Sequence, residues 1–273
     1  MISAVIPTLN RDDELSATLA RIREVAAGLV EQIIVVADGP TVAVDDAVEQ
    51  LDWCESVVLR TPRKIGPGGC RNLGVAYATC AYIAFLDDDV HLDAVWCEAV
   101  TSAVNRGYRV FTGPVTARDA TVLSQARELR YVQRYASLRL GQSVRFLAGG
   151  NSVIARLVFD QHGPFPSGAV ATDNALGRHL DSVGDSVRFV PAMRVTHRHD
   201  RGWHSAVSNA WRSGRTAEPG DLIRMAPAIE LVPAPRILAA SATNVALWSI
   251  HATGCLMGSA LSALPQRPDA TKA

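Results

Sequence analysis

The most informative stretch of the sequence is Tyr82-Ile83-Ala84-Phe85-Leu86-Asp87-Asp88-Asp89. A continuous run of mostly apolar residues is typical of a strand that is buried on both faces, as in a parallel sheet. Three carboxylates follow it directly. Adjacent carboxylates repel one another, so their charge is tolerable at a strand end mainly where a cation or solvent neutralises it. The stretch therefore predicts a buried strand that ends at a cation-binding turn, with a solvated acidic turn as the alternative.

Strands and helices alternate on both sides of this stretch. Leu15, Leu19 and Ile22 share one face of a helix that Asp12 or Asp13 can cap. Further helices are expected at residues 70–79, 92–105 and 172–183. Strands or extended segments are expected at residues 3–6, 33–36, 57–59, 109–115, 146–155, 187–191 and 194–197. This alternation predicts an α/β fold with a mainly parallel sheet and helices on both faces.

Composition narrows the class of protein. With 273 residues, of which 48% are hydrophobic, the chain can bury a full-sized core with or without an appendage. The formal net charge is zero, so the overall charge gives no reason to expect nucleic acid as a partner. The five cysteines include no C-x-x-C pair, which favours reduced thiols. The first residues have no basic segment of the kind found in signal peptides, so we expect a cytoplasmic protein.

The C-terminal part has a different composition. Residues 237–264 contain no Asp, Glu, Lys or Arg, and Gly254 and Gly258 form a G-x-x-x-G pair. That length could span a bilayer, but Ala, Ser and Thr dominate it. We therefore expect a helical extension over residues 216–273 that is a packed hairpin, a helix at the inner membrane surface or a membrane span. Membrane association and homodimerisation are its expected uses.

Polar residues follow several of the expected strands. Pro7-Thr8-Leu9-Asn10 comes after the first strand, Asp38-Gly39 after the second, and the three aspartates after the fourth. In parallel α/β sheets, ligands bind beyond the carboxyl ends of the strands. Oxygen ligands favour Mg²⁺ or Mn²⁺, which bridge to phosphate oxygens. This edge of the sheet is therefore expected to bind a divalent cation and a phosphate-bearing ligand.

A basic, glycine-rich stretch supplies positive charge for such a ligand. Arg60, Arg63, Lys64 and Arg71 are interleaved with glycines and lack any acidic neighbour between them. A glycine loop that opens a helix at Cys70 would also offer backbone N–H groups to an anion. The stretch is neither a Walker A motif nor a dinucleotide fingerprint. A solvated basic loop is the alternative.

Seven elements, in order, resemble those of family-2 glycosyltransferases with the GT-A fold. They are Val5-Ile6-Pro7-Thr8-Leu9-Asn10-Arg11, Val35-Val36-Ala37-Asp38-Gly39, Gly69-Cys70-Arg71-Asn72-Leu73-Gly74, Phe85-Leu86-Asp87-Asp88-Asp89, Gly149-Gly150-Asn151-Ser152 with Ala155-Arg156, Thr172-Asp173-Asn174 with Leu176, and Val190-Pro191 with Val195-Thr196-His197-Arg198. Each element is common by itself, but the ordered set is highly specific. The resemblance implies a GT-A mixed sheet flanked by helices over residues 1–215, followed by the helical extension.

The resemblance also implies roles for single residues. Asp89 and His197 would hold Mn²⁺ or Mg²⁺, and Asp173 would be the catalytic base. Gly150, Asn151 and Thr172 would lie on the acceptor side. The donor nucleotide would contact Pro7, Thr8, Asn10, Asp38, Arg71, Asp87 and Asp88.

The expected function is inverting, metal-dependent sugar transfer from a nucleotide-diphosphate sugar, with a UDP-sugar as first choice. The acceptor would be the hydroxyl of a small molecule, a lipid-linked compound or a glycan. Asp173 would take the proton of that hydroxyl while the cation offsets charge on the leaving diphosphate. A sugar-phosphate nucleotidyltransferase is one alternative, although its glycine-rich loop is missing after the first strand. A non-catalytic nucleotide-sugar-binding protein is another.

Two positions depart from the family pattern, and one stretch has two alternative interpretations. Ala37 stands where many relatives have the first of two aspartates, and Thr172 where a glutamate commonly precedes the base. The basic, aromatic stretch at residues 197–215 is expected to be a lid over the diphosphate or a solvated helix.

Overall fold

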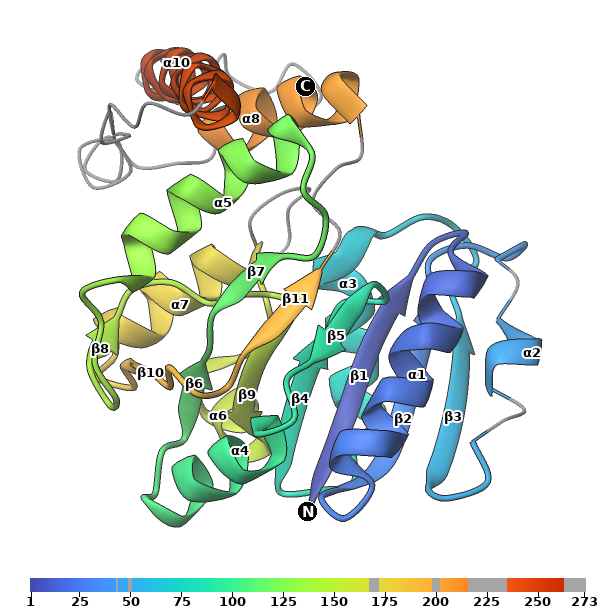
Figure 1. Cartoon of the computed structure of the whole chain (residues 1–273). Coiled ribbons are helices and arrows are strands. Elements are labelled where there is room, and N and C mark those ends of the chain that lie inside the picture. Colours follow the sequence, from blue (N-terminus) through green and yellow to red (C-terminus); the bar gives the residue numbers. More distant parts are fainter. Residues whose placement is uncertain (43, 49–50, 167–171, 198–201, 216–234, 263–273) are drawn as a thin grey trace, which may run out of the picture. The chain divides into compact units, whose positions relative to one another are not determined.

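The computed structural model describes residues 1–42, 44–48, 51–166, 172–197, 202–215 and 235–262 (Figure 1). The chain divides into two compact units. The first unit comprises residues 1–119 and 134–198, and the second comprises residues 120–133 and 199–273. All the predicted site residues belong to the first unit.

A mixed sheet forms the centre of the first unit. Eight strands of the described residues pair in the order β3-β2-β1-β4-β9-β6-β10-β8. The first four strands along the chain pair in parallel, whereas β9 runs antiparallel between β4 and β6. The strands are β1 (Ile2–Thr8), β2 (Val30–Ala37), β3 (Glu55–Arg60), β4 (Tyr82–Leu86), β6 (Val110–Thr112), β8 (Ser143–Val144), β9 (Asn151–Ala155) and β10 (Val187–Phe189). The predicted α/β class and mixed sheet are confirmed.

A second, smaller sheet positions part of the site. Within the described part of the chain it contains β5 (Val90–Leu92), β11 (Val195–His197) and β7 (Val115–Ala117), in that order. β11 runs antiparallel to β5, with His197 opposite Val90. The prediction of a helix from Leu92 is wrong for the first residues of that range, because Leu92 lies in β5 and the helix begins at Trp96.

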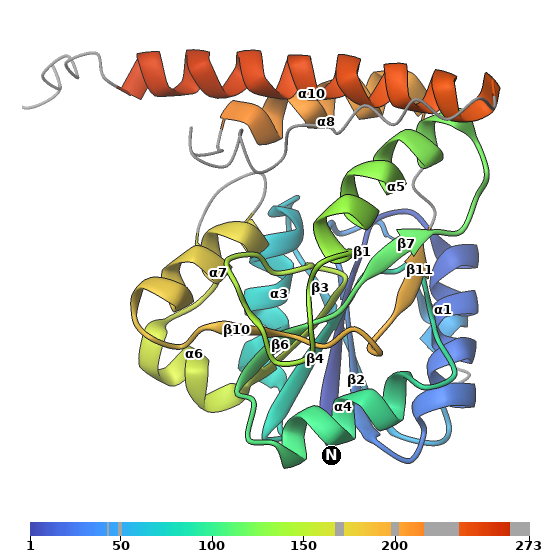
Figure 2. The same ribbon diagram turned by 60° about the vertical axis from the view of Figure 1, so that its left-hand side comes forward.

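Helices cover both faces of the main sheet (Figures 1 and 2). Leu15, Leu19 and Ile22 are buried, as their spacing predicts. The N-cap position is occupied by Arg11, which makes no side-chain capping hydrogen bond, and Asp12 and Asp13 lie within the first turn of the helix. The helices of this unit are α1 (Asp12–Ala26), α2 (Asp45–Val48), α3 (Gly66–Tyr77), α4 (Trp96–Asn105), α6 (Arg156–His162) and α7 (Thr172–Ser182).

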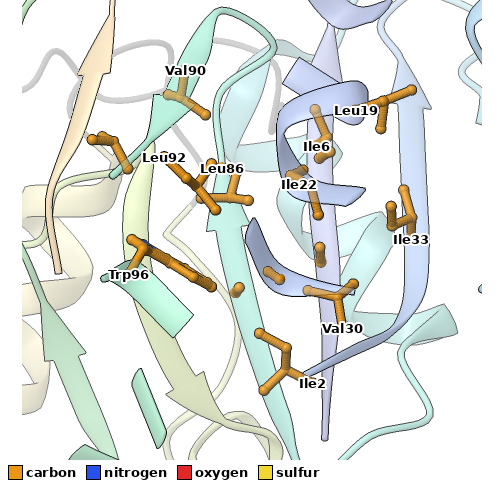
Figure 3. Close-up of a cluster of buried hydrophobic side chains, with 14 of the residues drawn as sticks. Ile2, Ile6, Leu19, Ile22, Val30, Ile33, Leu86, Val90, Leu92 and Trp96 are labelled. Atoms are coloured by element: carbon orange, nitrogen blue, oxygen red, sulfur yellow. The ribbon is translucent and has the colours of Figure 1, made fainter. Parts of the chain in front are cut away.

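Strand β1 shows how the core is divided between the two faces. Ile2 and Ile6 pack with α1 and Trp96 on one face (Figure 3), whereas Val5 belongs to the apolar cluster on the other. Successive side chains of a strand point to opposite faces, so a strand with both faces covered is apolar throughout. A Cβ at Gly74 would lie 2.3 Å from Val5 Cγ1, so a glycine is required where α3 crosses β1.

The second unit consists of helices in its described part. They are α5 (Val122–Tyr135), α8 (Gly202–Arg215) and α10 (Pro235–Ser262). Residues 237–262, for which a packed hairpin was one alternative, form a single continuous helix, so that alternative is wrong for them. The compact units divide near residue 198, and α8 groups with α10, whereas the sequence places a boundary at residue 215. None of the described helices is both long and apolar enough to cross a membrane.

Helices α8 and α10 lie side by side and pack through glycines (Figure 2). A Cβ at Gly214 would lie 2.1 Å from the carbonyl oxygen of His251, and a Cβ at Gly254 would lie 2.7 Å from that of Trp211. Gly254, one half of the G-x-x-x-G pair, therefore serves a close helix contact inside this unit.

Candidate functional site

The three carboxylates at the end of β4 each face an arginine. Arg71 Nη2 lies 3.0 Å from Asp87 Oδ1. Arg11 Nη1 lies 2.7 Å from Asp88 Oδ1 and 3.2 Å from Asp89 Oδ2. The positive charge that three adjacent carboxylates require thus comes from two side chains of the protein itself.

Asp88 is turned toward the protein. Asp88 is only 4% exposed. Its Oδ2 accepts a hydrogen bond from Thr8 Oγ1 at 2.8 Å, and its backbone oxygen accepts one from Thr18 Oγ1 at 2.9 Å. Burial raises the pKa of the Asp88 carboxyl, and the Arg11 charge and the Thr8 hydrogen bond oppose that rise. Thr8 and Asp88, both predicted to contact the nucleotide, therefore bind each other and fix the loop after β1 to the end of β4.

Asp89 and His197 meet because of the register between β5 and β11. His197 lies opposite Val90, the residue after Asp89, and its Nδ1 is 3.6 Å from Asp89 Oδ1. The two residues predicted to bind metal are therefore brought together. No set of three or more His, Cys, Asp or Glu side chains among the described residues is arranged to hold a metal ion. Mg²⁺ and Mn²⁺ sites commonly use one or two protein ligands, with waters and substrate phosphates completing the shell, and a carboxylate beside an imidazole fits such a site.

Asp38 caps helix α3. Its carboxylate accepts hydrogen bonds from the backbone N–H groups of Ile65 at 2.7 Å and Gly66 at 3.0 Å. A carboxylate at a helix N-terminus satisfies backbone donors and opposes the helix dipole. The prediction of a loop up to Cys70 is wrong, because helix α3 already begins at Gly66. Asp38, which was predicted to contact the donor nucleotide, instead has both carboxylate oxygens bound to backbone N–H groups at the start of α3.

Asp173 lies beside the Arg71–Asp87 pair. Its Oδ2 accepts the N–H of Gly149 at 3.1 Å, and its Oδ1 accepts a backbone N–H of the first turn of α7 at 2.9 Å. A Cβ at Gly149 would lie 2.8 Å from Arg71 Nη2 and 2.9 Å from Asp173 Oδ2, and one at Gly150 would lie 2.4 Å from Asp87 Oδ2. Two glycines are thus required for the backbone before β9 to pass between three charged side chains.

Asn151 has a structural role. It is fully buried, its Nδ2 donates to the carbonyl oxygens of Pro114 at 2.9 Å and Met193 at 2.7 Å, and its Oδ1 accepts from Trp96 Nε1 at 3.0 Å. Both N–H groups of the Asn151 side-chain amide are used in these hydrogen bonds. Asn151 therefore holds neighbouring backbone segments together and does not offer its amide N–H groups to an acceptor substrate.

The other predicted residues line the same edge. Thr172 is buried at the start of α7, where a Cβ at Gly68 would lie 2.6 Å from its Oγ1, so the first turns of α3 and α7 touch. Pro7 pairs with Val36 in the sheet, and Asn10 follows it with φ 55°. Asparagine is among the residue types that tolerate this left-handed turn conformation.

Sequence reasoning assigned no role to Arg11 or Asn72. Asn72 Nδ2 donates to the carbonyl oxygen of Phe165 at 2.9 Å, and its Oδ1 accepts the N–H of Phe165 at 2.8 Å. Arg71 in turn lies over the Phe165 ring, 5.9 Å from its centroid. The sequence did offer one indication that both residues matter: each lies within one of the seven elements that resemble the family. Arg198 and the rest of residues 198–201, part of the predicted lid, lie outside the described residues.

The topology and the site define the class of protein. A sheet that is parallel in its first half, an antiparallel strand beside β4 and a carboxylate turn at the end of β4 are the features of a GT-A glycosyltransferase fold. A mannosyltransferase, PcManGT from Pyrobaculum calidifontis, matches with a TM-score of 0.63 and 16% identity, over 97% of this chain and 76% of that one. GalNAc-T7 matches with a TM-score of 0.60 and 15% identity, over 79% and 47% of the two chains. TarS (residues 1–349) from S. aureus matches with a TM-score of 0.58 and 15% identity, over 87% of this chain and 70% of that one.

The chain belongs to glycosyl transferase family 2, whose model matches residues 3–163. The predicted family is thereby confirmed, and the first five of the seven elements lie within the matched residues. A pre-mycofactocin glycosyltransferase from Mycobacterium tuberculosis (strain H37Rv) is 31% identical over 233 residues, which cover 80% of this chain and 47% of that protein. This chain therefore spans about half the length of the curated relatives that it matches.

Proposed function

We propose that this chain is a metal-dependent glycosyltransferase that moves a sugar, with inversion, from a nucleotide-diphosphate sugar to an acceptor hydroxyl. The observation that supports this most strongly is the place of Asp173, beside the Arg71–Asp87 pair and oriented by the N–H of Gly149. A protein that only binds a nucleotide sugar has no need of a carboxylate there. A transferase needs one, because the attacking hydroxyl must lose its proton.

The donor is proposed to bind across the carboxyl ends of β1 and β4. Asp87 keeps a side chain that is 35% exposed, and Arg71 beside it provides a positive charge. Among the structural neighbours, PcManGT was solved with GDP-Man and Mn²⁺, GalNAc-T7 with UDP, GalNAc and Mn²⁺, and TarS with UDP-GlcNAc. A UDP-sugar remains our first choice, with a GDP-sugar as the comparison. Pro7 and Asn10 lie at the end of β1, where the nucleoside is expected.

Asp89 and His197 would hold the divalent cation, Mn²⁺ or Mg²⁺. When bound, such a cation supplies positive charge that stabilises the leaving diphosphate. The protein's contribution is the orientation of the carboxylate and the imidazole, which the pairing of β5 with β11 fixes.

Asp173 is proposed to be the general base. The N–H of Gly149 and the first turn of α7 fix the direction of its carboxylate. Thr172, which precedes it in the chain, and Gly150, which lies against Asp87, are proposed to lie on the acceptor side. One carboxylate acting as a base, with none acting as a nucleophile, gives a direct displacement and therefore inversion.

The acceptor and the tail complete the proposal. The acceptor is the hydroxyl of a small molecule, a lipid-linked compound or a glycan, and pre-mycofactocin, from the relative's name, belongs in the first test. The protein is proposed to work in the cytoplasm, with the helical extension serving association with the inner face of the membrane or with a second copy.

The test is donor turnover. Release of UDP or GDP from UDP-Glc, UDP-GlcNAc and GDP-Man is measured with Mn²⁺, in the presence and absence of candidate acceptors, for the wild type and for Asp173→Asn. We expect acceptor-dependent release from one donor, and its loss in the variant. Binding of a donor without release under any condition would favour a non-catalytic binding protein, and binding of none would contradict the proposal.

A further inference from the structure

Arg11 binds two neighbouring carboxylates through one nitrogen. It is the N-cap residue of α1, its side chain is 26% exposed, and its Nη1 contacts both Asp88 Oδ1 and Asp89 Oδ2. Arginine stays charged at any pH that the protein meets. Arg11 is therefore a permanent positive charge beside the predicted metal ligand Asp89.

The two contacts of Arg11 differ in kind. The contact with Asp88 is short, at 2.7 Å, and the carboxylate involved is buried and also accepts from Thr8. The contact with Asp89 is longer, at 3.2 Å, and the other oxygen of that carboxylate faces His197 at 3.6 Å. Both carboxylate oxygens of Asp88 are thus held by side chains of the protein, whereas Asp89 has one oxygen near His197, the residue with which it would share a cation.

We propose that Arg11 is a positioning residue that serves as the counterion of Asp89 until the divalent cation binds, and that the two positive charges compete for this carboxylate. The inference rests on the metal site of the proposed function. When the cation binds, Arg11 keeps its hydrogen bond to Asp88, so the end of β4 stays in place in both states.

Competition predicts two effects of opposite sign when the Arg11 charge is removed. Without metal, two adjacent carboxylates lose their common partner and repel one another, so the protein becomes less stable. With metal, the repulsion between guanidinium and cation disappears, so the cation binds more tightly. A purely structural arginine would weaken both stability and metal binding. An arginine that binds only the diphosphate would leave the binding of metal alone unchanged.

The experiment compares Arg11→Gln with Arg23→Gln in the full chain. Arg23 makes the matched control, because it lies on the same helix, is 55% exposed and faces only the exposed Asp52 at 3.4 Å among the described contacts. Melting temperatures are measured in EDTA. Mn²⁺ binding without nucleotide is measured from the loss of the electron paramagnetic resonance signal of free Mn²⁺.

We expect Arg11→Gln to lower the melting temperature in EDTA by about 2–8 °C and to tighten Mn²⁺ binding about tenfold. Arg23→Gln should change neither. If the wild type binds Mn²⁺ and Arg11→Gln binds it no more tightly, the competition is refuted while the metal site stands. If neither protein binds Mn²⁺, the metal site of the proposed function fails, and the competition with it.

A second variant decides the matter if Arg11→Gln does not fold. Lysine keeps the charge but lacks the rigid fork of donors that arginine presents to two carboxylates. The lysine of Arg11→Lys should therefore hold the Asp89 carboxylate less tightly than arginine does. The variant protein should bind Mn²⁺ about threefold more tightly than the wild type. Affinity equal to that of the wild type would overturn the proposal.

Discussion

Replacing Asp173 by asparagine separates a catalytic carboxylate from a structural one. The aspartate accepts the N–H of Gly149 with one oxygen and an N–H of its own helix with the other. Asparagine has a single oxygen, so one of these hydrogen bonds is lost, at a cost of about 0.5–1.5 kcal/mol. Loss of the negative charge at the start of α7 costs about 0.3–1 kcal/mol more. At about 2–4 °C for each kcal/mol, the melting temperature should fall by about 2–10 °C.

Activity should fall far more than this loss of stability explains. Removal of a general base typically lowers the rate by about 10²–10⁴. Asp181→Asn is the matched control, because Asp181 lies on the same helix and its two oxygens contact Ser186 Oγ at 3.1 Å and Arg145 Nε at 3.2 Å. The assay follows nucleotide release at saturating donor and acceptor, with melting curves from circular dichroism. Transfer by Asp173→Asn within a few-fold of the wild type, or an equal loss in Asp181→Asn, would refute the assignment.

Three further predictions concern the parts that support the site and the tail. Asn151→Ala removes three buried hydrogen bonds, although the Pro114 carbonyl oxygen still accepts the N–H of Val195, and should cost about 3 kcal/mol, measured by urea unfolding. Gly214→Ala forces a Cβ against the His251 carbonyl and should destabilise the α8–α10 pair by about 1–3 kcal/mol, seen as faster amide exchange in α10; Gly28→Ala, with nothing within 4 Å of the added Cβ, is the control. Burial, with the charge of Asp38, raises the pKa of the Cys70 thiol to about 12 from 9.0. Because the folded protein holds the thiol proton more tightly than the unfolded chain does, the stability that Cys70 contributes is fully present below pH 9 and is lost as the pH rises from 9 to 12. The urea midpoint should therefore fall less steeply above pH 9 in Cys70→Ala than in the wild type.

The parts of the site that follow from local pattern were predictable. Strand β4 and its three aspartates could be recognised because a strand buried on both faces is apolar along its length, and three carboxylates directly after such a run are unusual. The meeting of Asp89 and His197 was expected from the resemblance to the family, and the register of β5 and β11 brings the two together.

The parts that depend on contacts between distant segments were not predictable. Arg11 is an ordinary helix-start residue in the sequence, and only the folded chain places it between Asp88 and Asp89. The glycines before Cys70 resemble a loop because glycine disfavours helix, but Asp38 caps that turn from another strand. Helix α8 follows the last strand without a break in composition, so its grouping with α10 could not be read from the sequence.

We expect a divalent cation held by Asp89 to be required for binding the nucleotide of the donor. Isothermal titration calorimetry of UDP and GDP, in Mn²⁺ and in EDTA, with the wild type and with Asp89→Asn, tests it most directly. We predict tight binding of one nucleotide by the wild type in Mn²⁺, with a loss of at least tenfold in affinity in EDTA and in the variant. Equal affinity in Mn²⁺ and EDTA, for whichever nucleotide binds, would contradict the claim.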